Sequence, residues 1–232
     1  MSGRVRRGTE ILDKPGKAYP KTIELSVIDP PRFVSRGGEK LENFLSSMDL
    51  PIFGADALDV GASTGGFTDC LLQRGASSAT CVDVGHGQLH PKLLDNPRII
   101  NREKLNARYL KSSDLPKSTY SIITVDVSFI SLKLILPHLW PLLTGNGTLI
   151  SLIKPQFEAT KGEADKGRGI IRDPAIHYRV TEDIRRFAWK HLPDSREVKI
   201  SESSPPGNNG NIEFFLALQK ERKNQDLSHK LS

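Results

Sequence analysis

The feature that most constrains the fold of this chain is a regular alternation between short apolar runs and longer stretches. Apolar, β-rich runs of strand length recur at residues 55–61, 78–85, 98–103, 120–128 and 147–154. Most of the intervals between them are long enough to form a helix. Strands and helices that alternate in this way predict a mostly parallel sheet with helices on both faces.

The C-terminal third predicts a long helix followed by two more strands. Asp173 and Pro174 are typical of an N-cap and a first helical turn, and apolar residues then follow at helical spacing as far as Leu192. Two further strands, at 195–202 and 211–219, are joined by a hairpin-like loop rich in Ser, Pro, Gly and Asn. The expected fold is α/β and Rossmann-like, with about seven strands and an antiparallel last strand.

The two ends of the chain differ from this alternating body. Residues 1–31 contain turns, short strands and a diproline that indicates a linker, after which helical spacing begins near Gly38. We therefore expect a small N-terminal segment at 1–31, a main domain at 32–220 and a basic tail at 221–232.

The net charge of +6, from 33 basic and 27 acidic side chains, is concentrated at these ends. Residues 1–40 carry nine Lys or Arg against five Asp or Glu, and residues 219–232 carry four against two. Basic extensions on a neutral body favour a polyanionic partner, because each phosphate contact releases counterions. On charge alone, solvated chain ends are an equally good interpretation.

Several classes of protein are disfavoured by the composition. No stretch approaches the roughly 18 to 20 apolar residues of a membrane span, and no secretory signal follows the N-terminal arginines. Cys70 and Cys81, the two cysteines, lie in apolar runs, which favours buried packing over a disulfide or zinc site. The histidines are scattered. We expect a cytoplasmic protein with no metal.

The most informative motif is a strand that runs into a glycine-rich turn and then a helix, at residues 57–67. Such a turn lies at the carboxyl end of the first strand of a doubly wound sheet, where glycines allow the backbone to approach a nucleotide-like ligand. The spacing is closer to the acidic-x-Gly loop of S-adenosylmethionine enzymes than to Gly-x-Gly-x-x-Gly. Asp59 would then face a cationic amino-acid group, and Asp83, which ends the next strand, could accept ribose hydroxyls.

A second pair of charged residues ends two other strands. Asp126 follows the fourth run and Lys154 the fifth, so both are expected at the same edge of the sheet as the glycine-rich turn. A lysine that closes so apolar a strand must reach solvent or a carboxylate, and Asp126 is the neighbour that the topology supplies. The pair is either a structural ion pair or an acid/base pair in a cleft.

Seven ordered stretches carry a family resemblance: Phe33–Leu41, Asp59–Thr68, Val82–Gly85, Gly87–Leu89, Asp126–Leu132, Ile153–Phe157 and Gly210–Phe214. Together they resemble the TlyA family, which are FtsJ-like ribosomal RNA 2′-O-methyltransferases often labelled hemolysin A. The resemblance implies S-adenosylmethionine as the cofactor and methylation of a ribose 2′-hydroxyl in ribosomal RNA, with cytidine as the expected nucleotide.

The resemblance also assigns residues. The family's catalytic tetrad falls on Lys40, Asp126, Lys154 and Glu213. Its cofactor loop falls on Asp59, Gly61, Ser63, Thr64 and Gly65, with Asp83 in the ribose position. Within this set Lys154 is the candidate base for the hydroxyl proton, and the other three members would orient it.

RNA contacts are expected in two places, with ribosomal RNA or ribosomal subunits as the partner. Family members usually begin with a small RNA-binding module, and residues 3–28 resemble its final strands, so Arg4, Arg6 and Arg7 are candidate phosphate contacts. The loop after Lys154 contains Lys161, Lys166 and Arg168, which would cover the site and contact phosphate. A plain surface loop is the alternative.

Three other functions remain open at this point. A nicotinamide-dependent oxidoreductase shares the fold class, but the dinucleotide glycine pattern is absent. A membrane-active hemolysin would need a span or a basic amphipathic helix. A non-catalytic RNA-binding or assembly protein could retain the fold, although the complete tetrad disfavours it.

Overall fold

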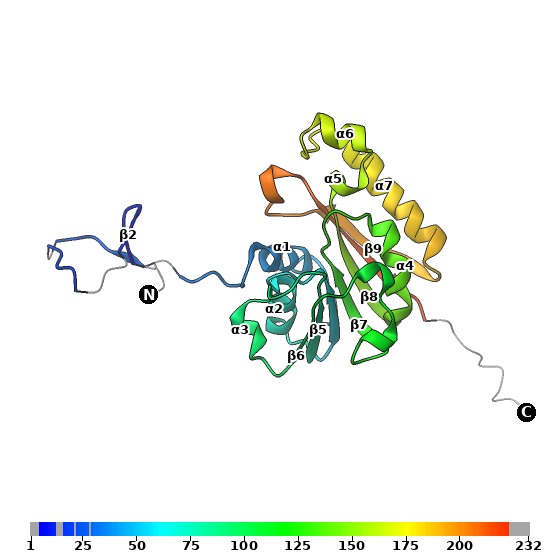
Figure 1. Cartoon of the computed structure of the whole chain (residues 1–232), viewed down its shortest axis with the longest axis horizontal. Coiled ribbons are helices and arrows are strands. Elements are labelled where there is room, and N and C mark those ends of the chain that lie inside the picture. Colours follow the sequence, from blue (N-terminus) through cyan, green and yellow to red (C-terminus); the bar gives the residue numbers. More distant parts are fainter. Residues whose placement is uncertain (1–4, 13–15, 21, 28, 223–232) are drawn as a thin grey trace, which may run out of the picture. The chain divides into compact units, whose positions relative to one another are not determined.

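The computed structural model describes residues 5–12, 16–20, 22–27 and 29–222. The chain divides into two compact units, Met1–Arg32 and Phe33–Ser232 (Figure 1). The smaller unit contains an antiparallel sheet in the order β2-β1-β3, formed by β1 (Val5–Arg7), β2 (Glu10–Ile11) and β3 (Ser26–Val27). Two predicted features, Arg4 and most of the basic tail (223–232), lie outside the described residues.

The larger unit is built on a seven-stranded sheet in the order β6-β5-β4-β7-β8-β10-β9. Its strands are β4 (Asp56–Val60), β5 (Ser78–Val82), β6 (Ile99–Arg102), β7 (Tyr120–Val125), β8 (Leu143–Ile153), β9 (Ser195–Glu202) and β10 (Phe214–Lys220). The strands from β6 to β8 pair in parallel, whereas β10 is antiparallel to both of its neighbours. The predicted Rossmann-like α/β fold with an antiparallel last strand is confirmed.

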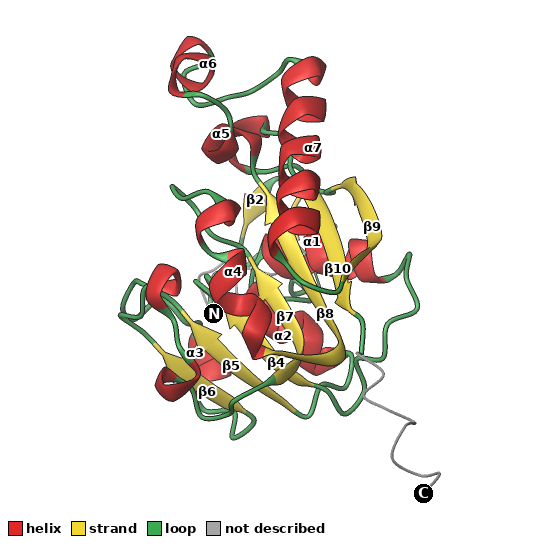
Figure 2. Ribbon diagram, turned by 90° about the vertical axis from the view of Figure 1, so that its right-hand side faces the viewer, coloured by secondary structure: helices red, strands yellow, loops and turns green. Residues whose placement is uncertain are grey.

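Helices cover both faces of this sheet (Figure 2). They are α1 (Arg36–Leu45), α2 (Gly66–Gln73), α3 (Pro91–Leu94), α4 (Leu136–Leu139), α5 (Pro155–Glu158), α6 (Lys161–Lys166) and α7 (Pro174–His191). Short 3₁₀ turns occur at Ala107–Tyr109, Ser112–Asp114, Leu132–Leu134, Trp140–Leu142 and Asn208–Gly210. One apolar cluster joins α1 and α2 to the sheet, and another joins α4 and α7 to its opposite face.

Several elements end earlier or later than the sequence predicts. The strand expected at 120–128 ends at Val125, and the one expected from 211 begins at Phe214. The first helix stops before Met48, because the Ser46 and Ser47 hydroxyls donate to backbone carbonyls of its last turn. Only 3₁₀ turns, without an α-helix, connect β6 to β7.

Strand direction explains which residues meet at one edge of the sheet. In the parallel set, Val60 pairs with Val125 and Val125 with Ser151, so β4, β7 and β8 finish at the same edge. Strand β10 runs the other way and starts there, with Phe214 opposite Ile153. The residue before β10 is thus brought next to residues that follow the parallel strands.

Candidate active site

A cavity of about 550 Å³ lies at this edge, and all four residues of the predicted tetrad line it. Asp126 follows β7, Lys154 follows β8, Lys40 lies in α1 and Glu213 precedes β10. These four side chains come from positions up to 173 residues apart in the chain and are arranged as two ion pairs.

The first pair joins Lys154 to Asp126. The Lys154 Nζ forms an ion pair with Asp126 Oδ1 at 2.6 Å and donates a hydrogen bond to Ser128 Oγ at 3.1 Å. The Lys154 side chain is 12% exposed, so it is confined but still reaches the cavity. The topological prediction that Asp126 is the partner of Lys154 is confirmed.

The second pair is more deeply buried. The Lys40 Nζ donates to Glu213 Oε2 at 2.6 Å, and both residues are buried. The loop before β10 packs directly on this carboxylate, because a Cβ at Gly207 would lie only 2.3 Å from Glu213 Oε1. A buried charge needs a group of opposite charge at short range, and Lys40 and Glu213 each provide this for the other.

The glycine-rich turn joins β4 to α2 and lies beside Asp126. Gly61 has a φ of +79°, and a Cβ there would lie 2.2 Å from the carbonyl oxygen of Asp126. Only glycine therefore allows the turn to approach the end of β7 so closely. Ser63 and Thr64 line the same cavity, whereas Gly65 is the N-cap of α2.

Asp59 lies beneath this turn and is 1% exposed. Its Oδ2 accepts hydrogen bonds from the Thr68 backbone and hydroxyl, at 3.0 and 2.7 Å, and its Oδ1 accepts from the Thr124 hydroxyl at 2.9 Å. Burial raises the pKa of Asp59 to about 6, and the charge of Asp126 adds to this effect. Asp59 thus fixes the start of α2, and its expected contact with the cofactor's ammonium group stays a prediction.

A second cavity of about 440 Å³ shares Gly61, Ser63 and Asp126 with the first and is also lined by Asp83. The Asp83 carboxylate accepts from the Ser63 backbone at 2.8 Å and from the Gly85 backbone at 2.7 Å. The two cavities therefore meet at the glycine-rich turn and Asp126, with Asp83 on one side and Lys40, Lys154 and Glu213 on the other.

Glu103 holds the loop that follows Asp83. It accepts hydrogen bonds from the Gly87 backbone at 2.8 Å and from His86 Nδ1 at 2.7 Å. The Gly87 backbone and other donors lower the pKa of Glu103 to about 2. The carboxylate is therefore ionised at neutral pH, as an acceptor of several N–H groups should be.

Comparison with known proteins indicates a methyltransferase family. Residues 33–220 match the FtsJ-like methyltransferase family. YqxC of Bacillus subtilis, named an rRNA methyltransferase, is 41% identical over 94% of this chain and 77% of its own length. The 16S/23S rRNA (cytidine-2′-O)-methyltransferase TlyA of Mycobacterium tuberculosis is 37% identical over 94% of this chain and 81% of its own. The chain belongs to the FtsJ-like methyltransferase family, in its TlyA/hemolysin A branch.

A solved structure agrees with this FtsJ-like assignment. A protein named a hemolysin, from Streptococcus thermophilus, is 39% identical and aligns with a TM-score of 0.79. The alignment covers 98% of this chain and 82% of that one. The fold is thus shared over nearly the whole chain.

The FtsJ-like site also contains residues to which sequence reasoning gave no role. Ser128 contacts Lys154, and Phe129 and Phe157 line the cavity with their ring centroids 4.9 Å apart. Asn211 accepts from the Ile171 backbone and donates to the Gly169 carbonyl, which ties the segment before α7 to the start of β10. The available signal was their place in stretches that carry the family resemblance, Asp126–Leu132, Ile153–Phe157 and Gly210–Phe214, which did not assign them a role.

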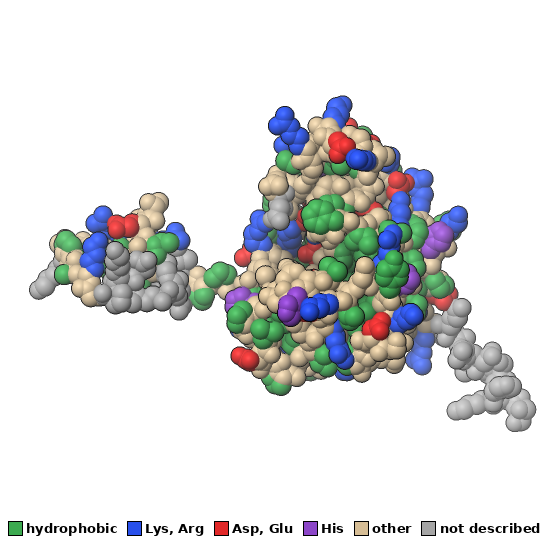
Figure 3. Space-filling view, in the orientation of Figure 1, with side chains coloured by type: hydrophobic (Ala, Val, Ile, Leu, Met, Phe, Trp, Pro, Cys, Tyr) green, Lys and Arg blue, Asp and Glu red, His purple; other side chains and the backbone are tan. Residues whose placement is uncertain are grey.

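The candidate RNA contacts occupy different environments. Arg6 and Arg7 lie on β1 in the smaller unit, where Arg7 pairs with Glu10 at 3.2 Å. Lys161, Lys166 and Arg168 are exposed, and Lys and Arg side chains stand out over α6 in the space-filling view (Figure 3). Gly169, next to them in the chain, lines the cavity. The basic segment is therefore close to the FtsJ-like site.

Two further observations concern the described part of this FtsJ-like chain. No helix there is long and apolar enough to cross a membrane, and no three His, Cys, Asp or Glu side chains gather as a metal site would require. Cys70 and Cys81 are both buried, as the sequence predicts.

Proposed function

We propose that this protein methylates the 2′-hydroxyl of a cytidine ribose in ribosomal RNA. The observation that supports it most is the convergence of Lys40, Asp126, Lys154 and Glu213 on one cavity that adjoins a second, nucleotide-sized cavity. Two of the relatives described above, YqxC and TlyA, are named as rRNA methyltransferases, and the name of TlyA specifies cytidine.

The residues at the junction of the two cavities fit S-adenosylmethionine, the cofactor of the family. Asp83 offers carboxylate oxygens to the ribose hydroxyls, and the Gly61 turn lets the backbone come close. Asp59, whose charge is costly to bury, provides a negative group for the ammonium. When bound, the cofactor supplies an electrophilic methyl group on a sulfonium.

The chain's own chemical task is to orient the ribose hydroxyl and remove its proton. Asp126 and Ser128 together hold the Lys154 Nζ at the cavity wall. In its neutral form Lys154 accepts the hydroxyl proton as the nucleophile forms, and Asp126 stabilises the resulting ammonium. Base catalysis of this kind contributes roughly 10²- to 10⁴-fold to the rate.

The mouth of the cavity suits a nucleotide. Phe129 is 91% exposed and lies against Phe157 at the cavity, so its ring is available to an unstacked base. Stacking of a base on an aromatic ring contributes about 1 to 3 kcal/mol. The exposed cations around α6 are in a position to contact the phosphates of the same strand.

The direct test is to incubate the protein with radiolabelled S-adenosylmethionine and ribosomal subunits that lack the modification, and then to map 2′-O-methyl groups. We expect label in RNA at a cytidine ribose. Label on a base, or on protein only, would contradict the proposal. The Lys154→Ala variant serves as the matched negative control.

A further inference from the structure

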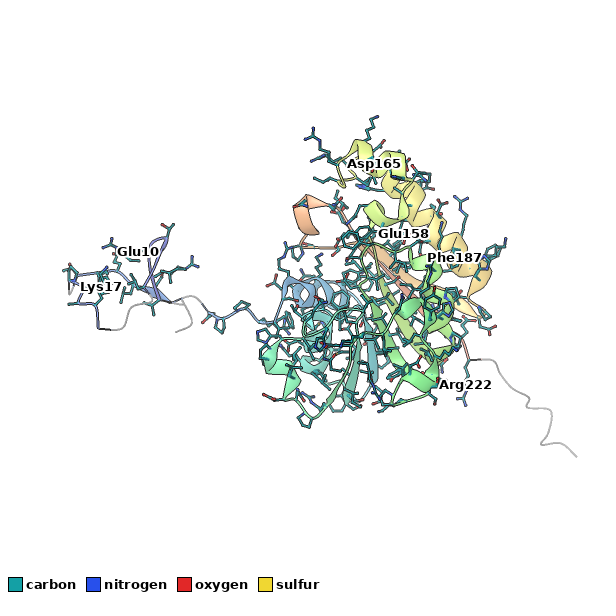
Figure 4. All side chains as sticks on the ribbon, viewed as in Figure 1. Glu10, Lys17, Glu158, Asp165, Phe187 and Arg222 are labelled. Carbon is teal, nitrogen blue, oxygen red and sulfur yellow. The ribbon has the colours of Figure 1, made fainter. Side chains whose placement is uncertain are left out.

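Asp126 and Lys154 each begin a short segment that leads away from the site. From Asp126 the chain passes through Phe129 to Ser131, and from Lys154 it passes through α5 to Glu158. At their near ends the two segments are joined by the ion pair of 2.6 Å between Lys154 and Asp126. At their far ends they are joined by the hydrogen bonds of Glu158, which is labelled in Figure 4.

Glu158 makes two short hydrogen bonds across this gap. Its Oε2 accepts from the Ser131 hydroxyl at 2.5 Å, and its Oε1 accepts from the Leu132 backbone N–H at 2.6 Å. The Ser131 hydroxyl in turn accepts from the Lys133 backbone at 3.2 Å. The carboxylate therefore closes a ring, whose sides are residues 127–131 and helix α5.

The ring holds the residues that face the acceptor. Phe129 has a φ of +63°, a left-handed conformation that an aromatic residue rarely adopts, so contacts on either side must maintain it. On one side Ser128 is bound by Lys154, and on the other Ser131 is bound by Glu158. Phe157, one residue before Glu158, packs against the Phe129 ring.

We propose that Glu158 is a positioning residue that holds the Phe129 loop, and through it Lys154 and Asp126, in the geometry required for methyl transfer. This inference rests on the proposed function. It assigns to Glu158 no contact with substrate, cofactor or the reacting atoms. The loop it holds lines both cavities, but its own hydrogen bonds go to Ser131 and Leu132 and not to Asp83 or the glycine-rich turn, so its effect should fall mainly on the acceptor side of the reaction.

Substitutions at Glu158 can test separately whether its hydrogen bonds or its charge matter. A glutamine at 158 can accept from the Leu132 N–H through its carbonyl and donate to the Ser131 hydroxyl, which has free acceptor capacity. Burial raises the pKa of Glu158, so a neutral group suits this position. An aspartate keeps the charge but is one methylene too short to reach both donors. If Glu158 acts by positioning the loop, the Glu158→Gln variant should be active and the Glu158→Asp variant should be impaired.

The matched control for Glu158 is Asp56, which begins β4 and so lies at the end of that strand away from the tetrad. It accepts from the Ser77 and Ser78 hydroxyls at 2.9 and 2.6 Å and pairs with Lys117. Asp56→Ala removes a carboxylate with serine partners, as Glu158→Ala does, but far from the tetrad edge. Any loss that both variants share reports general destabilisation.

The experiment measures kcat, KM for ribosomal subunits, S-adenosylmethionine affinity and Tm for these four variants of the full chain. Displacement of reacting groups by about 1 Å can cost about 100-fold, so we expect Glu158→Ala to lower kcat roughly 10- to 100-fold with cofactor affinity within about twofold of wild type. Glu158→Gln should remain within about threefold of wild type, and Asp56→Ala should retain its kcat.

Three results would overturn the inference. A Glu158→Ala kcat near wild type would remove the positioning role. Equal losses in Glu158→Ala and Asp56→Ala at equal Tm would make the effect one of stability. Rescue by aspartate but not by glutamine would make the charge decisive. If wild type itself transfers no methyl group, the proposed function fails instead.

Discussion

Asp59 is a carboxylate whose charge should cost the fold stability, and Asp59→Asn tests this directly. The side chain is 1% exposed, and burial raises its pKa from 3.8 to about 6. Asparagine can keep every hydrogen bond: its carbonyl can accept from Thr68, and its amide can donate to the Thr124 hydroxyl, which rotates to accept. The substitution therefore removes the charge with little other change.

The sign and size of the effect of Asp59 on the free energy of unfolding follow from the linkage between protonation and folding. Below about pH 4 the carboxyl is protonated in both states and costs nothing. Between about pH 4 and 6 the unfolded chain releases the proton while the folded protein retains it, so stability falls as the pH rises. A shift from 3.8 to about 6, at 1.36 kcal/mol per pKa unit, corresponds to about 3 kcal/mol.

Thermal unfolding of the wild type and of Asp59→Asn between pH 4 and 7.5 measures the stability cost of the Asp59 charge. The contributions of the other titrating groups cancel when the two proteins are compared at the same pH. For a chain of this size 1 kcal/mol shifts Tm by about 2 to 4 °C, so the Tm advantage of the variant should grow by about 6 to 12 °C across the range. A difference that does not change with pH would refute the linkage. Cofactor affinity should fall in the same variant if the charge serves the ammonium.

Three other substitutions test separate parts of the site. Asp83→Ala should weaken S-adenosylmethionine by about 1 to 3 kcal/mol in calorimetry, because it removes a ribose acceptor, and unchanged binding would exclude that role. Gly61→Ala should lower Tm and cofactor affinity well beyond Gly54→Ala. Both glycines have a positive φ, but only the Cβ added at Gly61 would clash, 2.2 Å from the Asp126 carbonyl oxygen. Equal effects of the two substitutions would argue against the close approach of the turn to Asp126. A triple alanine variant at the α6 segment should flatten the slope of log RNA affinity against log salt by about 2 if all three cations contact phosphate, and an unchanged slope would make it a plain surface loop. The three positions are Lys161, Lys166 and Arg168.

The fold and half of the tetrad followed from the sequence for a simple physical reason. Parallel strands buried on both faces require continuous apolar runs, so β4, β5, β7 and β8 are visible in the hydropathy pattern. The antiparallel strands β9 and β10 were instead indicated by the hairpin-like loop between them. Because parallel strands end at one edge, the proximity of Asp126 and Lys154 could be predicted from topology alone. Their separation of 2.6 Å in the structure bears this out.

Other contacts could not be predicted from spacing. The Lys40–Glu213 pair depends on the reversed direction of β10 and on a loop that packs against the carboxylate, and only the family resemblance pointed to it. The Asp59 partners come from α2 and from β7, 65 residues away. Glu158 had no sequence signal, since its partners lie 26 and 27 residues earlier in a loop whose path is set by tertiary packing.

The most direct test of the proposed chemistry is the single-turnover rate of methyl transfer to unmodified ribosomal RNA by Lys154→Ala, with cofactor affinity measured on the same preparation. Loss of base catalysis should lower the rate by roughly 10²- to 10⁴-fold while S-adenosylmethionine affinity stays within about twofold of wild type. A rate within about tenfold of wild type would contradict the assignment of Lys154 as the group that takes the hydroxyl proton.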